Sequence, residues 1–138
     1  MRELVLDCSA LLAWLFPDEG DPYGMALIEV MRESTAYVPS IWWLEVANAV
    51  LVAERKARLT QSDSVELMRI VDSLSIVQDT EQPEDWVHRV MMLGRVYGLS
   101  AYDACYLELA IRRGLPVATL DRALMNAAAA AGATVFEP

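Results

Sequence analysis

The sequence predicts an α/β fold in three layers, α/β/α, with a parallel sheet and helices on both of its faces. Short apolar segments typical of buried strands alternate with longer segments typical of helices. No tight hairpin turn joins two successive strand segments, which favours parallel pairing. No glycine- or serine-rich linker and no internal repeat divides the 138 residues, so we expect one domain over residues 1–138.

Strand and helix signals alternate through the first half of the chain. Runs of aliphatic residues predict the strands, and caps or first-position prolines predict where the helices begin. Thr60 and Asp63 have the spacing of a capping box, in which each side chain bonds the other's backbone N–H. The predicted elements are a strand at residues 4–6, a helix over 10–16 capped by Ser9 and stopped by Pro17, a helix from Asp21-Pro22 to about Arg32, a strand at 36–38, a helix from Ser40 to about Arg58, and a helix opened by Thr60.

The second half continues the same alternation. Gly98 and Gly114 predict helix ends, because glycine readily adopts the left-handed conformation found there. Ser100 and Asp121 predict helix starts. The predicted elements are a strand at 75–77, a helix from Pro83 to about Tyr97, a helix from Ser100 to Gly114, a strand at 116–119, a helix capped by Asp121, and a short fifth strand at 134–136.

Composition places the chain among folded proteins that do not cross a membrane. Hydrophobic residues make up 55% and charged residues 22%, which excludes a disordered tail. No apolar run reaches the roughly 18 residues of a membrane span, and the N-terminus lacks the layout of a signal peptide, so we expect a cytoplasmic protein. Cys8 and Cys105 have neither a disulfide framework nor zinc-ligand spacing, and we interpret them as free thiols.

The formal net charge of −9 argues against a surface that is basic as a whole and that binds nucleic acid through that overall charge. A polyanion would have to approach a local basic patch, and Arg55, Lys56 and Arg58 form a short one. The remaining charge clusters are more often solvated faces. They are the acidic segment Asp79, Glu81, Glu84 and Asp85, and the basic residues Arg112, Arg113 and Arg122.

Three aspartates have both a structural and a functional interpretation. Asp7 and Asp121 directly follow predicted strands, at the sheet edge where parallel folds bind ligands. Each could instead only cap a turn or a helix. Asp103 interrupts the apolar run 99–107, but it follows Ser100 by three residues, which is also capping-box spacing. Taken singly, these three residues slightly favour the structural interpretation.

Glu45 favours a functional interpretation. It is the only charge in residues 41–53 and lies in the middle of a predicted helix, where no cap is needed, with Asn48 on the same face. With the three aspartates it predicts an acidic cluster, and carboxylates at short range need a cation to stay ionised. Oxygen ligands of this kind select Mg²⁺ or Mn²⁺, which can activate water and stabilise charge on a phosphate. Ser9 and Thr119 are candidates to orient a carboxylate or that water. His88 stands alone and is not expected to catalyse.

Four segments occur in an order and spacing that together resemble a known family: 5-VLDCSALLAWL-15, 43-WLEVANAVL-51, 99-LSAYDACYLELA-110 and 117-VATLDRAL-124. The chain resembles the PIN-domain ribonucleases, in particular the VapC toxins of toxin–antitoxin pairs. The resemblance implies a five-stranded parallel sheet in the order 3-2-1-4-5 and Mg²⁺-dependent endoribonuclease activity. It also implies an acidic site of Asp7, Glu45, Asp103 and Asp121. Asp7 and Asp103 would bind the metal directly, and Glu45 and Asp121 directly or through water.

The resemblance also implies partners. VapC-like proteins are typically homodimers, act on RNA, and are inhibited by a cognate VapB-like antitoxin whose C-terminal segment occludes the site. Trp42 and Trp43 are candidate exposed aromatic residues for self-association. The tryptophans as a group (Trp14, Trp42, Trp43 and Trp86) are expected in the core or an interface rather than as platforms for stacked bases.

Two alternatives remain open from the sequence. A PIN-like RNA-binding or interaction module without catalysis would have no use for four mutually repelling acids. A metal-dependent phosphatase would need a second aspartate two residues after the first, or a lysine near the last strand. Position 9 is Ser9, and the only lysine is Lys56.

Overall fold

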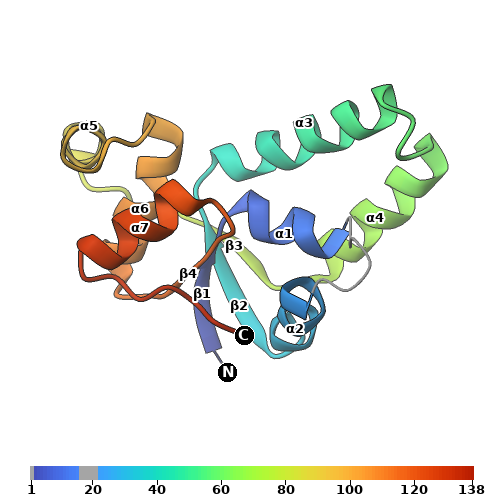
Figure 1. Cartoon of the computed structure of the whole chain (residues 1–138), viewed down its shortest axis with the longest axis horizontal. Coiled ribbons are helices and arrows are strands. Elements are labelled where there is room, and N and C mark those ends of the chain that lie inside the picture. The colour runs from blue at the N-terminus through green and yellow to red at the C-terminus, as the bar shows by residue number, and fades with distance from the viewer. Residues whose placement is uncertain (1, 16–21) are drawn as a thin grey trace.

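The computed structural model describes residues 2–15 and 22–138 and contains a parallel sheet between two layers of helices (Figure 1). Its four strands are β1 (Arg2–Leu6), β2 (Ser34–Val38), β3 (Ile76–Gln78) and β4 (Val117–Ala118), in the order β3-β2-β1-β4. Every pairing between them is parallel, with Leu4 opposite Ala36 and Val5 opposite Val117. The predicted α/β class with a parallel sheet is therefore confirmed.

The predicted fifth strand at residues 134–136 is wrong, because the described chain has four strands. That segment forms one isolated parallel bridge, between Val117 and Val135. The N–H of Val117 donates to the carbonyl of Thr134 at 2.9 Å, and the N–H of Phe136 donates to the carbonyl of Val117 at 2.7 Å. The segment lies at the outer edge of β4, the place that the order 3-2-1-4-5 gives to a fifth strand. Since β4 has only two residues, it offers too short a template for a longer ladder.

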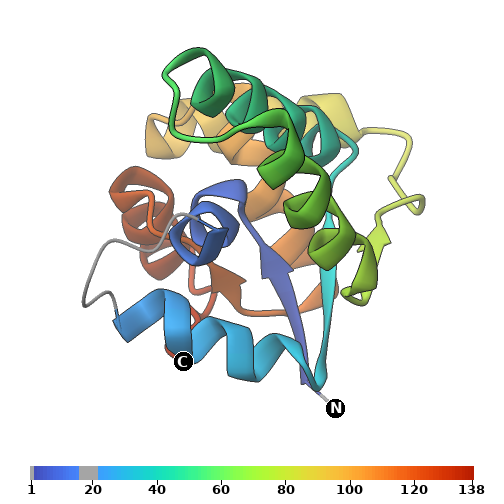
Figure 2. The same ribbon diagram turned by 90° about the vertical axis from the view of Figure 1, so that its right-hand side faces the viewer.

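Seven helices in the described residues cover the two faces of the sheet (Figure 1). They are α1 (Cys8–Leu15), α2 (Pro22–Met31), α3 (Ile41–Arg55), α4 (Gln61–Ser73), α5 (Trp86–Tyr97), α6 (Ala101–Arg113) and α7 (Arg122–Ala130). Helices α5 to α7 lie on one side, where α6 contacts β1 and β4. Helices α1 to α4 lie on the other, with α1 between α2 and α3 in both views (Figure 2).

The buried core explains why some segments are apolar throughout. Leu4, Val5 and Leu6 are fully buried because helices cover both faces of the central strand. Residues 104–110 of α6 are all buried, since the helix lies between the sheet, α5 and α7. The apolar run that contains Asp103 therefore belongs to the most buried helix, and α6 brings this acid to the edge of the core.

Several predicted helix signals are confirmed by hydrogen bonds. Thr60 Oγ1 accepts from the N–H of Asp63 at 3.1 Å, and the N–H of Thr60 donates to Oδ2 of Asp63 at 2.9 Å, which completes the capping box. Gly98 and Gly114 end α5 and α6 in the left-handed region, with φ of 68° and 66°.

Three predicted helix boundaries differ from the structure. Ser9 does not cap α1, because the helix already begins at Cys8. Helix α3 ends at Arg55 rather than at about Arg58, and α5 begins at Trp86 rather than at Pro83. The predicted helix end at Phe16 and Pro17 and the predicted cap Asp21 lie outside the described residues.

Trp42 is fully buried, so its prediction as an exposed residue for self-association is wrong. Trp43 is partly buried against the core, and the two rings meet edge to face. Cys8 and Cys105 are buried free thiols, as expected. Among the described residues, the helices are all too short or too polar to cross a membrane.

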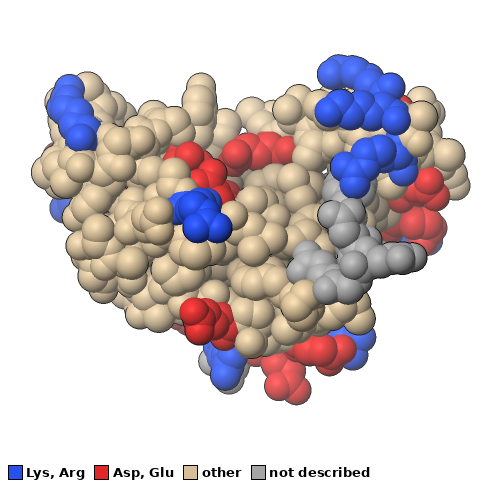
Figure 3. Space-filling model, in the orientation of Figure 1, with Lys and Arg blue, Asp and Glu red and all other residues tan. Residues whose placement is uncertain are grey.

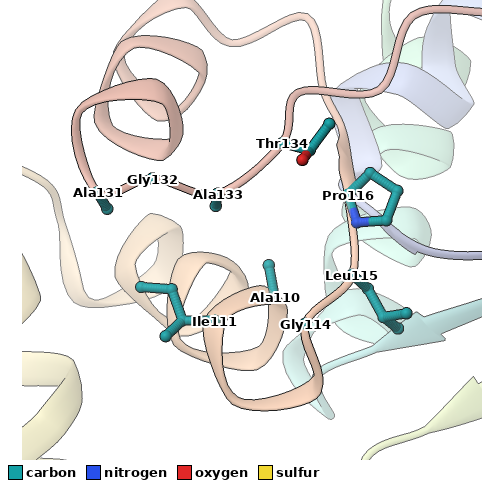
Figure 4. Close-up of a pocket in the computed structure, with 9 residues that line it drawn as sticks. All are labelled: Ala110, Ile111, Gly114, Leu115, Pro116, Ala131, Gly132, Ala133 and Thr134. Atoms are coloured by element: carbon teal, nitrogen blue, oxygen red, sulfur yellow. The ribbon is translucent and has the colours of Figure 1, made fainter.

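A cavity of about 270 Å³ lies between the C-terminal ends of α6 and α7 (Figure 4). Its lining contains no charged side chain and includes Ala110, Gly114, Pro116 and Gly132. Pro116 directly precedes β4. The cavity therefore lies at the amino ends of the strands, opposite their carboxyl ends. It is therefore separate from the predicted acidic site.

Candidate active site

Asp7 lies at the carboxyl end of β1 and is 5% exposed. Its N–H donates to the carbonyl of Ala118 at 3.0 Å, which holds the ends of β1 and β4 side by side. The hydroxyls of Ser9 and Thr119 both donate to Oδ2 of Asp7, each at 2.7 Å. The structure thus places both predicted supporting residues directly on this carboxylate and holds it in one position.

The turn between β4 and α7 brings Asp121 to the same edge of the sheet. The N–H of Asp121 donates to Oγ1 of Thr119 at 3.0 Å, and the N–H of Leu120 donates to Oγ of Ser9 at 3.0 Å. Asp121 Oδ1 accepts from the N–H of Leu124 at 3.0 Å, so this residue caps α7 as predicted. The cap uses one carboxylate oxygen and leaves Asp121 close enough to Asp7 to influence its charge.

Asp103 is half-buried in the first turn of α6. Its N–H donates to Ser100 Oγ at 3.1 Å, so Ser100 is the predicted cap. In the described structure the carboxylate of Asp103 does not return a bond to the Ser100 backbone, as Asp63 does to Thr60 at the start of α4. Only one half of the predicted capping box is therefore formed, and the structural and functional interpretations of this acid both stay open.

Glu45 is half-buried on α3, and its Oε1 accepts a hydrogen bond of 2.6 Å from the phenol of Tyr106. Tyr106 is fully buried on α6, three residues after Asp103. The sequence analysis did not identify Tyr106 as a site residue. Its spacing from Asp103, which puts both on one helix face, was the available signal. Asn48, the predicted neighbour of Glu45, is exposed.

The electrostatics of the four acids show that they share one environment. Burial raises the pKa of Asp7 above its usual value of 3.8, and the charge of Asp121 raises it further against the hydrogen bonds from Ser9 and Thr119. Burial and the charges of Asp121 and Asp7 raise the pKa of Asp103. Burial raises the pKa of Glu45 above 4.5, with contributions from Asp7 and Asp103. The structure therefore brings together side chains from α3, α6 and the ends of β1 and β4.

Salt bridges do not neutralise these acids within the described residues, although one basic side chain borders the acidic ones in the view of Figure 3. None of the ion pairs there involves Asp7, Glu45, Asp103 or Asp121. Figure 3 shows acidic side chains gathered in the hollow between the α5–α7 side and the α3 side of the molecule. A cluster of this kind is neutralised either by protonation or by a cation bound from solution.

The donor set fits a hard divalent cation that keeps part of its water shell. In residues 2–15 and 22–138, no group of three or more aspartate, glutamate, histidine or cysteine side chains is arranged to hold a metal ion. Mg²⁺ does not require one, because it is usually held by one or two carboxylates and retains several waters. Oxygen-only ligands at the hollow match this preference, whereas a structural zinc site would need a closed set of four ligands.

Thiol chemistry is disfavoured at the site. Burial and the charges of Glu45 and Asp7 raise the pKa of Cys8 to about 12. Burial and the charges of Glu45, Asp103 and Asp7 raise the pKa of Cys105 to about 12. Both thiols are protonated at neutral pH and are poor nucleophiles. His88 is exposed on α5.

A second group of buried charges, which we call the ion-pair network, consists of Asp79, Glu108, Arg112 and Arg113. Arg112 Nη2 lies 2.6 Å from Asp79 Oδ2 and 2.8 Å from Glu108 Oε1. Arg113 Nη2 lies 3.6 Å from Asp79 Oδ1, and its guanidinium stacks over the ring of Tyr37 at 4.4 Å. The interpretation of Arg112, Arg113 and Asp79 as solvated charges is therefore wrong.

Comparisons with known proteins identify the family and the fold of the chain. The family model of the PIN domain matches residues 4–130. PAE2754 from Pyrobaculum aerophilum has a similar crystal structure, with a TM-score of 0.68, 24% identity, and coverage of 91% of this chain and 86% of that one. FitAcB from Neisseria gonorrhoeae gives a TM-score of 0.68 at 20% identity and covers 98% of this chain and 97% of that one. No curated protein sequence matches the chain.

Proposed function

The chain belongs to the PIN-domain family, and we propose that it is a Mg²⁺-dependent endoribonuclease that acts as the toxin of a toxin–antitoxin pair. PIN domains are generally metal-dependent nucleases, which supports a hydrolase acting on nucleic acid. The observation that carries the proposal is the acidic cluster: the charges of Asp7, Asp103 and Asp121 act on neighbouring carboxyl groups of the set, and no member forms a salt bridge among the described residues.

Asp7 and Asp103 would hold the metal, with Glu45 and Asp121 bound to it directly or through water. A divalent cation held by carboxylates activates water and stabilises charge on a phosphate under in-line attack. Mn²⁺ would substitute for Mg²⁺, since both prefer oxygen ligands.

The chain's own residues have distinct tasks in this proposal. Ser9 and Thr119 fix Asp7 through Oδ2, so the carboxylate does not have to reorganise when it binds the metal. Glu45 uses Oε1 for Tyr106, and its second oxygen is available to orient the attacking water. The backbone N–H groups at the starts of α6 and α7 favour an anion such as the scissile phosphate.

Partners follow from the same proposal. A VapB-like antitoxin would insert a basic side chain into the acidic cluster in place of the metal, because an arginine pairs strongly with carboxylates. A homodimer is also proposed. With Trp42 buried, the apolar surface available for contacts includes Val87, Met91 and Tyr102, which are 58%, 43% and 62% exposed. The substrate is RNA, and the protein acts in the cytoplasm.

The decisive test is cleavage of RNA by the metal-free protein to which one ion is added back. We expect internal cuts in a circular single-stranded RNA with Mg²⁺ or Mn²⁺, and none with EDTA. Asp7→Asn should be inactive. Asp72→Asn is the matched control, because Asp72 is an exposed acid on α4 remote from the cluster. Equal cleavage in EDTA contradicts the proposal, and RNA binding without cleavage in either ion favours a non-catalytic module.

A further inference from the structure

We propose that Tyr106 is a positioning residue of the acidic site, which acts by holding the Glu45 carboxylate in a fixed place. The phenol of Tyr106 donates to Glu45 Oε1 at 2.6 Å, across 61 positions in the sequence. The functional part of this inference rests on the proposed nuclease activity. The contact itself does not depend on that activity.

The burial of the two partners shows which one holds the other. Tyr106 is 0% exposed, and its ring is confined by the core around α6. Glu45 is half-buried on α3, so part of its side chain is in contact with solvent. A rigid, fully packed ring that bonds a longer, partly solvated side chain restricts that side chain, because glutamate otherwise loses much rotamer entropy when it is placed.

The placement of Tyr106 is also suited to this role. It lies three residues after Asp103 on α6, so one helix supplies both a candidate metal ligand and the donor to Glu45. The charges of both Glu45 and Asp7 act on the Tyr106 phenol, which puts its hydroxyl beneath the acidic cluster. Burial raises the pKa of that phenol, so it remains a proton donor over the working pH range.

A purely structural role would not require the hydroxyl. A phenylalanine fills nearly the same volume in a buried helix face. The short O–H···O⁻ bond to a charged acceptor is of the stronger type, and it engages one of the two Glu45 oxygens. Tyr106 therefore restricts the orientation in which the Glu45 carboxylate meets a metal or a water.

The test compares Tyr106→Phe with Tyr97→Phe, a control that removes a phenol from a partly buried tyrosine on α5. We expect Tyr106→Phe to lower kcat about tenfold or more with little change in KM for RNA, because positioning acts on the chemical step. Mn²⁺ binding, measured by calorimetry, should weaken severalfold. The control should change neither quantity.

A double-mutant experiment separates positioning from packing. Glu45→Gln alone should lower kcat about 10²-fold. Adding Tyr106→Phe to it should cause little further loss, because Tyr106 acts through Glu45. If Tyr106→Phe costs as much in the Glu45→Gln background as in the unmodified protein, or leaves kcat and Mn²⁺ binding unchanged, the inference is overturned.

A spectroscopic measurement that does not depend on RNA cleavage tests the inference separately from the proposed function. In metal-free protein carrying ¹³C-labelled glutamate, the side-chain carboxyl signal of Glu45 should shift and broaden in Tyr106→Phe but not in Tyr97→Phe. If the unmodified protein does not cleave RNA and the signal still responds, the nuclease proposal fails and Tyr106 positions Glu45 for other chemistry. An unchanged signal overturns the positioning role whatever the activity.

Discussion

The molecule contains two groups of buried or half-buried acids, of which one is paired with arginines and the other is not. In the ion-pair network, Arg112 contacts both Asp79 and Glu108, and Arg113 lies beside Asp79. Burial would raise the pKa of Asp79, but the hydrogen bonds from Arg112 and the Glu81 backbone and the charges of both arginines outweigh it and lower that pKa. In the acidic cluster, every resolved pKa shift of a carboxyl group is upward.

The contrast shows that the lack of salt-bridge partners is a property of the acidic cluster and not of the whole molecule. The same helix, α6, carries Asp103 at its beginning and both network arginines at its end. Acidic residues near a helix start and basic residues near its end also suit the helix dipole. Since this fold pairs the acids of the network with arginines but not those of the cluster, the cluster is the region in which we propose that a cation binds.

The largest expected effect comes from removing one carboxylate of the acidic cluster. Asp7→Asn or Asp103→Asn should reduce RNA cleavage by about 10³-fold, because each removes a proposed metal ligand. The metal-free variants should melt at the same or a higher temperature, since one repelled charge is gone and the amide oxygen introduced at position 7 can still accept from Ser9 and Thr119. Single-turnover cleavage and thermal melting measure both effects. Loss of the folded state in both variants would mean that these acids are structural.

Removing an arginine from the ion-pair network should instead lower the stability of the protein. Arg112→Gln should lower the free energy of unfolding by about 3–5 kcal/mol, because it leaves two buried acids with a weakened partner set. Urea unfolding at neutral pH measures this. Arg89→Gln is the matched control: Arg89 lies 3.0 Å from Asp85 in an exposed pair, which should be worth under about 1 kcal/mol. Equal losses in the two variants would remove the distinction.

A change in pH should alter the stability contributions of the acidic cluster and of the ion-pair network in opposite directions. Because the pKa values of Asp7, Glu45 and Asp103 are raised, the folded state binds protons more tightly than the unfolded chain. Stability of the metal-free protein should fall as pH rises from about 4 through these raised pKa values. Asp79 has a lowered pKa, so its contribution is present above 3.8 and is lost as pH falls below that value. We expect a stability maximum in mild acid.

Mg²⁺ should remove the neutral-pH part of this dependence. At about 100 times its dissociation constant, a ligand specific to the folded state adds about 2.7 kcal/mol. Melting curves from pH 4 to 8 with EDTA or Mg²⁺ provide the measurement, and Asp7→Asn should reduce the difference between them. An identical pH dependence with and without Mg²⁺ would separate the acids from metal binding.

The smallest effect concerns the basic tip, which we define as Arg55, Lys56 and Arg58 at the C-terminal end of α3. Figure 3 shows basic side chains gathered at this end of the molecule. Arg55 lies ten residues beyond Glu45, roughly 15 Å along the helix axis. Replacing the three residues with glutamine should weaken RNA binding and flatten its salt dependence. The cut sites and kcat should change little. Altered cut sites would mean that the basic tip recognises the RNA sequence.

Local signals predicted most of the fold from the sequence. Caps at Thr60, Ser100 and Asp121 and the stops at Gly98 and Gly114 depend on neighbouring residues only, and the structure has all five. The alternation of strands and helices also predicted the parallel sheet. The fifth strand was not predictable in the same way, because its length depends on how much of β4 is available to pair with it.

The sequence by itself also determined which acids are unusual in their surroundings, since Glu45 and Asp103 interrupt apolar segments at residues 41–53 and 99–107. Tertiary structure decided what surrounds them. It placed Ser9 and Thr119 on Asp7, joined Tyr106 to Glu45, and paired Arg112 with Asp79 instead of leaving it on a solvated face. Most of these contacts join residues far apart in the chain, and spacing along a sequence carries no information about a partner that only the packing of helices on a sheet brings within reach.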